Sequence, residues 1–185
     1  IDQMIQFAKN NPNKLNFGSP GVGSLGHFSG ELFKSACQIS FKHVPFSGSA
    51  PSVTALMGGH IDFLVTALPA LGGKVASGDL RVLASFADKR LPEMKDVPTF
   101  SEKGYPNVVM SGWFAFVAPA KTPSDIVLKL NKAVADTLTD ASMTETLKKL
   151  GFNPAYIPSS ELKKYISDEL KRASEIAKKE NIVID

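Results

Sequence analysis

Three glycines near the start of the chain have the spacing G-x-G-x-x-G. They are Gly21, Gly23 and Gly26, within the stretch FGSPGVGSLGH. In dinucleotide-binding folds, such glycines let the backbone between a strand and a helix approach a pyrophosphate, which the first N–H groups of the helix then bind. The chemistry that this pattern indicates is therefore the binding of an anion at the start of a helix.

A nucleotide fits the sequence poorly. In dinucleotide-binding folds, the strand after the glycine turn ends in an Asp or Glu that binds the ribose hydroxyls. Here the next strand-like segment ends FKHVPF, without a carboxylate, and the strand before the glycines is only the short stretch LNF. No Gly-Lys-Ser or Gly-Lys-Thr follows the glycines, so the P-loop pattern is absent as well. We expect no nucleotide and no other cofactor.

An α/β hydrolase-like enzyme is the alternative that the residue types allow. It would use Ser24 as the nucleophile, His27 as the base and Asp62 as the third member of a triad. However, Ser24 lies in VGSLG, which lacks the first glycine of the G-x-S-x-G nucleophile elbow. His27 follows Ser24 on the same expected helix, where it can equally well cap the helix or pack. We therefore expect a protein that is not an enzyme and keep the hydrolase as the alternative.

The glycine turn can bind an anion without any basic side chain. The first N–H groups of a helix lack partners inside the helix, and the helix macrodipole is positive at this end. No Lys or Arg lies between Lys14 and Lys34. A carboxylate bound here would be held by backbone dipoles and by the hydroxyls of Ser19 and Ser24.

A second turn of the same kind follows the next strand-like segment. Phe46-Ser47-Gly48-Ser49-Ala50 opens an expected helix over residues 50–57, with Ser49 as its N-cap. In a parallel sheet, both turns lie at the carboxyl ends of their strands, which is the edge where ligands bind. Two helix N-termini at one edge suit a ligand with one or more carboxylates. The other possibility left open is that both turns are only tight helix entries made of favourable cap residues.

Strand-like and helix-like segments alternate through the first half of the chain, which predicts an α/β fold with a parallel sheet. After Asp88 the chain becomes polar and rich in proline, and the C-terminal part is mainly helical. The expected strands are 15–17, 39–46, 60–67, 80–86, 108–120 and the short NPAYIP, residues 153–158. The expected helices are the stretch IDQMIQFAKNNPNKL at residues 1–15, 24–36, 50–57, most of 68–78, a short one at 99–103, one from Pro123, 141–150 and 159–179.

Composition excludes several classes of protein. The chain has 185 residues with a net charge of +3, and its C-terminal lysines alternate with acidic residues. This alternation is typical of a solvated helix face, so no nucleic-acid partner is expected. No apolar run reaches the roughly 18 residues of a membrane span. Cys37, the only cysteine, is expected to be a buried small apolar residue, and the three histidines show no ligand spacing with carboxylates, so no metal site is expected.

The chain resembles a known family over nearly its whole length. The resemblance lies in NPNKLNFGSPGVGSLGHFSGELF, in HVPFSGSAPSVTALMGGHIDF and in the long stretch from LPALGGKVASGDL to KLNKAV. These motifs are similar, in order and spacing, to those of tripartite tricarboxylate transporter substrate-binding proteins, the TctC-like or Bug family of periplasmic solute receptors. The resemblance implies a two-lobed, Venus-flytrap periplasmic binding protein fold of type II. It also implies a periplasmic receptor that closes on a small carboxylate and delivers it to a membrane permease.

The family resemblance also implies the site. The ligand-binding residues that it indicates are Ser19, Gly21, Gly23, Ser24, His27, Phe46, Ser47, Gly48, Ser49, Ala50 and Thr66. At position 66 many members carry an Asp. A Thr there removes an acceptor for a ligand ammonium group and would suit a ligand without one. The ligand class is left open among a tricarboxylate, a dicarboxylate, an acidic amino acid and an aromatic carboxylate.

The chain also departs from the family in length. Family members begin with a signal peptide and an N-terminal lobe, and this sequence, which starts in what resembles the inside of a helix, is expected to be a fragment without them. On this basis we expect residues 1–110 to form one ligand-binding lobe, 111–118 to be a crossover strand, and 119–185 to belong largely to the other lobe. Apolar surfaces that would face the absent part are expected to promote self-association.

Overall fold

Three short parallel strands form the sheet of the protein. In the computed structural model, which describes residues 1–179 and 182, they are β1 (Asn16–Ser19), β2 (Lys42–Pro45) and β3 (Phe63–Leu64). Their order is β2-β1-β3, and Phe17 of β1 stands opposite His43 of β2 and Phe63 of β3. The predicted parallel α/β sheet is confirmed for these three strands.

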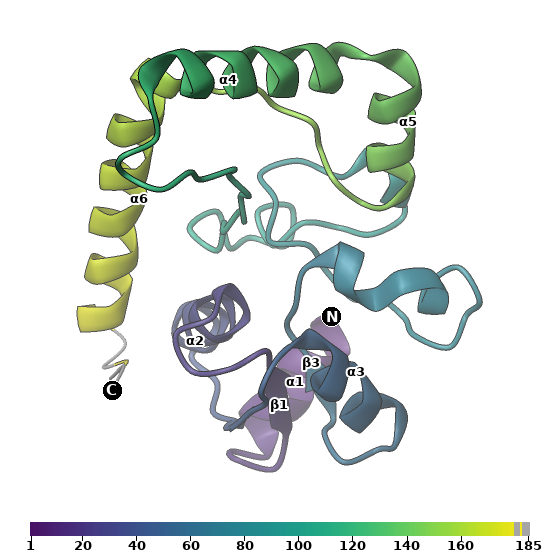
Figure 1. Ribbon diagram of the computed structural model, residues 1–185. Helices are drawn as coiled ribbons and strands as arrows, with labels where there is room; N and C mark the ends of the chain where they lie inside the picture. Colours follow the sequence, from purple (N-terminus) through teal and green to yellow (C-terminus); the bar gives the residue numbers. More distant parts are fainter. Residues whose placement is uncertain (180–181, 183–185) are drawn as a thin grey trace. The chain divides into compact units, whose positions relative to one another are not determined.

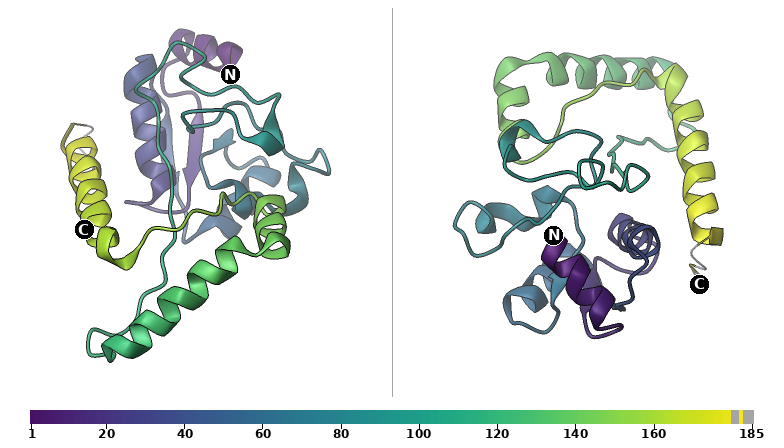
Figure 2. Two further views of the ribbon diagram at one scale, coloured as in Figure 1. Left: turned by 90° about the horizontal axis from the view of Figure 1, so that it is seen from above. Right: turned by 180° about the vertical axis from the view of Figure 1, so that it is seen from behind.

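Two helices connect the strands and cover opposite sides of the sheet. α2 (Leu25–Cys37) joins β1 to β2, and α3 (Ser49–Met57) joins β2 to β3. The first crossover runs from the central strand β1 to the edge strand β2, and the second runs back across β1 to the other edge strand, β3. Because crossovers between parallel strands are right-handed and these two run in opposite directions, their helices must lie on opposite faces. Figures 1 and 2 show α2 and α3 on either side of β1.

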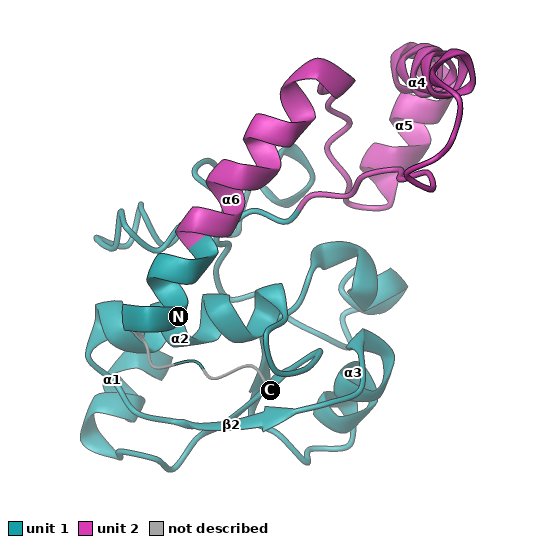
Figure 3. Cartoon of the chain, turned by 60° about the vertical axis from the view of Figure 1, so that its left-hand side comes forward, with its two compact units in different colours: residues 1–112, 173–185 teal, residues 113–172 magenta. Residues whose placement is uncertain are grey.

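The chain divides into two compact units (Figure 3). Unit 1 comprises Ile1–Gly112 with Ala173–Asp185, and unit 2 comprises Trp113–Arg172. Unit 1 contains the sheet and α1 (Asp2–Asn10), followed after β3 by two 3-10 helices, η1 (Leu68–Lys74) and η2 (Pro92–Met94). The remaining helices are α4 (Ser124–Thr139), α5 (Ala141–Lys149) and α6 (Ser159–Lys179). None of the helices in the described residues combines the length and the apolar character needed to cross a membrane.

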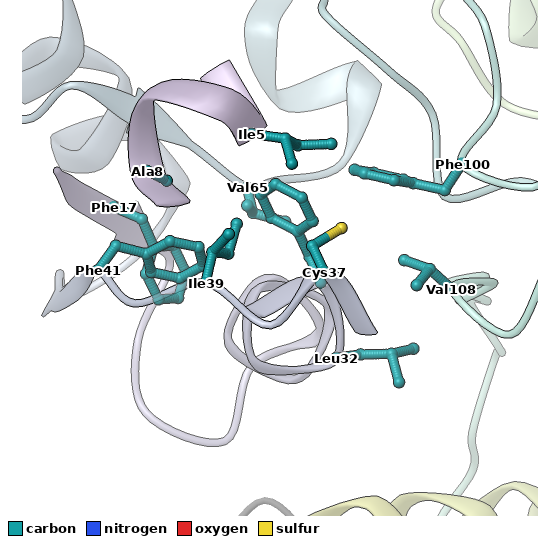
Figure 4. Packing of buried hydrophobic residues seen from close by; sticks show 11 residues of the cluster. Ile5, Ala8, Phe17, Leu32, Cys37, Ile39, Phe41, Val65, Phe100 and Val108 are labelled. Atoms are coloured by element: carbon teal, nitrogen blue, oxygen red, sulfur yellow. The ribbon is translucent and has the colours of Figure 1, made fainter. Parts of the chain in front are cut away.

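An aromatic cluster forms the core of unit 1. Phe17 is fully buried, and its ring contacts that of Phe41 edge-on, with 5.1 Å between the centroids. Figure 4 shows these rings among apolar side chains from α1, α2 and the loop after β3. Cys37 is 2% exposed, which confirms its predicted role as a small buried residue.

Helix predictions are confirmed for α1, α2, α4, α5 and α6, whereas several strand predictions are wrong. Residues 80–86 contain only an isolated bridge, from Ser85 to Thr99, and 108–120 and 153–158 form no strand. A strand requires a hydrogen-bonding partner along its length, and the described residues provide only isolated backbone hydrogen bonds to these segments, such as that from the N–H of Met110 to the carbonyl of Phe86. In unit 2, Phe114 and Phe116 are 80% and 86% exposed, so the apolar character of this segment does not reflect a buried strand. The short helix expected at 99–103 is a turn.

Candidate functional site

The turn between β1 and α2 depends on glycines. Gly21 has φ 143° and Gly23 has φ 73°, values that residues with a Cβ rarely adopt. The N–H of Ser24 donates to the carbonyl of Gly21 at 3.2 Å, which closes the turn. Ser24 is the N-cap of α2, and its Oγ accepts from the N–H of His27 at 3.2 Å. The sequence folds here into a tight entry to a helix, as its glycine spacing predicts.

The turn between β2 and α3 has the same form. Gly48 has φ 143° and is the N-cap of α3, without a capping side chain. The prediction that Ser49 is the N-cap is therefore wrong by one residue, because the glycine conformation brings the chain into the helix earlier. Ser49 is the first residue of α3 and its hydroxyl accepts from Oγ1 of Thr66 at 3.4 Å. Ser47 and Ala50 are exposed.

The two turns lie together at the carboxyl ends of the three strands. The N–H of Phe46 donates to the carbonyl of Ser19 at 3.1 Å, so the two turns begin side by side. The N–H of Val65 donates to the carbonyl of Gly18 at 3.0 Å, which brings the end of β3 to the same place. Thr66 follows directly and reaches Ser49. The structure thus brings all three predicted segments of the site together.

Backbone donors are available at this edge. The N–H groups of Leu25 and Gly26 stand in the first turn of α2, and those of Ser49 and Ala50 in the first turn of α3. These groups have no partner inside their helices. Among the described residues no cap or loop group accepts a hydrogen bond from them either. With the positive ends of two helix macrodipoles, they can bind an anion.

The site is built without formal positive charge. No Lys or Arg occurs between Lys14 and Lys34 or between Lys42 and Lys74, the two segments that contain both turns. An anion bound here would be stabilised by N–H groups and hydroxyls alone.

The serine hydroxyls of the first turn are engaged within the protein. Ser19 is fully buried, and its Oγ accepts from the N–H of Gly21 at 3.2 Å and donates to the carbonyl of Gly21 at 3.1 Å. The Ser24 hydroxyl caps α2 as described. That these two hydroxyls donate to a ligand stays a prediction, and in the structure both hold the shape of the turn.

His43 is the residue of this region that sequence reasoning missed. Its Nε2 shares a hydrogen bond of 2.7 Å with the Ser19 hydroxyl. Its ring stacks on that of His27, with 4.1 Å between the centroids and 13° between the planes. One signal was available in the sequence. Phe41 and His43 are two residues apart in an extended segment, so an inward-facing Phe41 places His43 on the same side.

Acid is expected to destabilise the protein through His43. Burial, and next the neighbouring His27, lower the pKa of His43 from 6.5 to about 4. Between these values the unfolded chain binds more protons than the folded one. We therefore expect the free energy of unfolding to fall as the pH falls through this window and to level off below it. Urea denaturation at a series of pH values measures the free energy of unfolding.

Two variants isolate this contribution. His43→Gln keeps a polar group near the position of Nε2 and cannot titrate, so it should lose part of the dependence on pH. His60→Gln, at an exposed position, is the matched control and should retain all of it. If the free energy of unfolding of His43→Gln depends on pH as steeply as that of the wild type, His43 is not the source of the acid sensitivity.

The residues of the hydrolase alternative do not form a triad. Nδ1 of His27 accepts from the N–H of Gly23 at 3.1 Å, and the Ser24 hydroxyl is bonded to the backbone of His27 rather than to its ring. Oδ2 of Asp62 accepts from the backbone N–H and the side-chain amide of Asn16 at 2.7 and 3.1 Å. All three groups have structural partners, so the geometry does not support this alternative.

Comparisons with known proteins agree with this architecture. A family model described as "Tripartite tricarboxylate transporter family receptor" matches residues 1–182. Protein BugT of Bordetella pertussis is 31% identical over 93% of the chain. The structure titled "R. palustris Rpa4515 with adipate" is 32% identical and superposes with a TM-score of 0.93 over 99% of the chain. MatC (Rpa3494) from Rhodopseudomonas palustris with bound malate is 25% identical over 95% of the chain, with a TM-score of 0.81.

The chain spans about half the length of the curated relatives that it matches. It covers 53% of BugT and 61% of the Rpa4515 and MatC chains. The α/β fold is that of the periplasmic binding proteins among these structures, as the family resemblance implies. With a family model that matches almost every residue, the chain belongs to the tripartite tricarboxylate transporter receptor family, the TctC family.

Proposed function

We propose that this chain carries one side of the ligand site of a periplasmic solute receptor, which captures a small carboxylate for a tripartite tricarboxylate-type permease. The observation that carries the proposal is the convergence of two helix starts with free N–H groups, those of α2 and α3, at the carboxyl ends of three parallel strands. This arrangement favours an anion. The receptor is not an enzyme.

A dicarboxylate is the ligand class that we favour. The related structures of Rpa4515 and MatC contain adipate and malate, and both ligands bear two carboxylates. The side chain that many family members provide as Asp is Thr66 here, which keeps this edge uncharged. An uncharged edge with two helix N-termini accommodates carboxylates and gives an ammonium group no counter-ion.

The assignment of segments to lobes is part of the same proposal. We assign residues 1–110 to one ligand-binding lobe, 111–118 to the crossover and 119–185 largely to the other lobe. The exposed side chains of Phe114, Phe116 and Val117 support packing of this segment against a further part of a longer receptor. The 185 residues by themselves would then self-associate through such surfaces.

Binding of a dicarboxylate is expected to raise the melting temperature of the complete polypeptide encoded by the reading frame that contains these residues. At a concentration about 100 times Kd, adipate or malate should raise it by ~5 °C or more. The neutral diamide of adipic acid has the same length and should have no effect. A screen in which no carboxylate raises the melting temperature, or in which the diamide acts equally, would refute the proposal.

Two substitutions at one position separate the backbone donor from the hydroxyl. Ser49→Pro removes the N–H and suits the first position of a helix, where proline is favoured. Gly48 before it has ψ 177°, which a following proline permits. Ser49→Ala removes only the hydroxyl. We expect Ser49→Pro to weaken binding by about tenfold or more, and Ser49→Ala by less, because hydrogen bonds to charged groups are the stronger ones.

A further inference from the structure

Three aromatic rings form a stack beneath the first turn of the site. The ring of His43 lies between that of Phe17, at 4.5 Å and 22°, and that of His27, at 4.1 Å and 13°. The three residues come from β1, β2 and α2. The stack therefore joins the elements whose ends form the anion-binding edge.

The outer edges of the two imidazoles hold the backbone of this turn. His43 is bonded through Nε2 to the Ser19 hydroxyl, which bonds both the N–H and the carbonyl of Gly21. His27 accepts the N–H of Gly23 through Nδ1. Between them, the two rings fix both glycines whose conformations define the turn.

The bond from Gly23 specifies the protonation state of His27. Nδ1 can accept this hydrogen bond only when it carries no proton, so the ring is neutral with its proton on Nε2. Protonation of Nδ1 would set one N–H against another and break the bond. The position of the Gly23 N–H is thereby coupled to the charge of the imidazole.

We propose that His27 and His43 are positioning residues of the carboxylate site, whose first turn keeps its binding shape only while His27 is neutral. The inference rests on the proposed function. It adds a regulation of the site: acidification weakens ligand binding through the shape of the turn, although a charged imidazole would by itself attract an anion.

The surrounding charges favour the neutral pair. Burial lowers the pKa of both imidazoles, and two charged rings stacked at this distance would repel each other. The charges that act on them are those of Glu31, which raises the pKa of His27, and Lys34, which lowers that of both rings. Glu31 is buried and forms an ion pair with Lys34, so its effect is offset. The adjacent strands β1 and β3 contain no titratable side chain.

The test measures the Kd for adipate of the complete receptor polypeptide by calorimetry between about pH 7.5 and about pH 5, the range in which histidine titrates. His27→Asn retains an acceptor near the position of Nδ1 and cannot become charged. His27→Leu removes the acceptor. His60→Asn, at an exposed position, is the matched control. Adipate itself gains protons in this pH range, and this affects its binding to every variant equally. The effect cancels when the Kd of each variant is divided by the Kd of the wild type at the same pH.

At neutral pH, His27→Leu should weaken binding by about tenfold or more and His27→Asn by less, because the partly buried N–H of Gly23 would lose its acceptor. On acidification the wild type should lose affinity relative to His27→Asn by about threefold or more, while His60→Asn follows the wild type. The inference is overturned if the ratio of wild type to His27→Asn stays constant, or if the wild type gains relative affinity. A wild type that fails to bind any carboxylate at neutral pH would instead refute the proposed function.

Discussion

Replacing Gly26 with alanine is expected to lower the free energy of unfolding by ~1–3 kcal/mol and to weaken carboxylate binding. A Cβ at this position would overlap the carbonyl oxygen of Val65 and lie 2.8 Å from Cδ of Pro20. Neither group is the flexible end of a side chain, so the start of α2 would have to move away from the end of β3. The N–H of Gly26 stands in the first helical turn, and this movement would displace it from the site.

The sign of this effect distinguishes packing from helix propensity. In an unobstructed helix, alanine is more favourable than glycine by about 1 kcal/mol, so propensity alone predicts a more stable variant. Gly73→Ala is the matched control, because a Cβ there meets no atom within 4 Å among the described residues. We expect that control to change stability by less than ~1 kcal/mol. Urea denaturation and calorimetry with adipate measure both quantities, and a Gly26→Ala protein that is more stable than the wild type would contradict the packing argument.

The convergence of the two turns at one edge could be predicted from sequence because its determinants are local. A glycine that must adopt a positive φ, and a serine that caps a helix, leave a signal within a few residues of where they act. The turn before Leu25 has both features, in Gly21, Gly23 and Ser24, and the turn before Ser49 has the glycine alone, Gly48. Their meeting at one edge then follows from the geometry of a parallel sheet.

The segments after β3 could not be predicted because apolar composition does not reveal a strand's partner. Residues 80–86 and 108–120 have the residue types of buried strands. Strand formation depends on continuous hydrogen bonding to another extended segment, whereas the described residues supply an isolated bridge between Ser85 and Thr99 and a single bond from the N–H of Met110 to the carbonyl of Phe86. Phe114, within residues 108–120, is exposed, so the apolar residues of this segment do not belong to a buried strand of this sheet.

The role of His43 also escaped prediction, for a different reason. The stack depends on the register of β2 against β1 and on the rotation of α2 about its axis, neither of which one residue specifies. From sequence, His43 and His27 are two histidines without a shared spacing. Only the fold brings the centroids of their rings within 4.1 Å.

Truncation of Phe17 to alanine is expected to lower the free energy of unfolding by ~3–5 kcal/mol, the largest effect of any substitution considered for this protein. The ring is fully buried and contacts those of Phe41, His43 and Phe63, with centroid distances of 5.1, 4.5 and 5.7 Å. Its removal leaves a cavity between the sheet and the cluster. Phe7→Ala, at a residue 48% exposed, is the control and should cost less than ~1 kcal/mol.

Phe17→Leu separates the loss of volume from the loss of the stack. Leucine retains most of the apolar volume, so the cost should stay below ~1.5–2 kcal/mol, but it offers no ring face to His43. Water and motion at His43 should then raise its pKa from about 4 towards 6.5, which an NMR titration of the imidazole measures. A stable Phe17→Leu protein in which His43 titrates as in the wild type would show that Phe17 supports the core without holding the histidine pair.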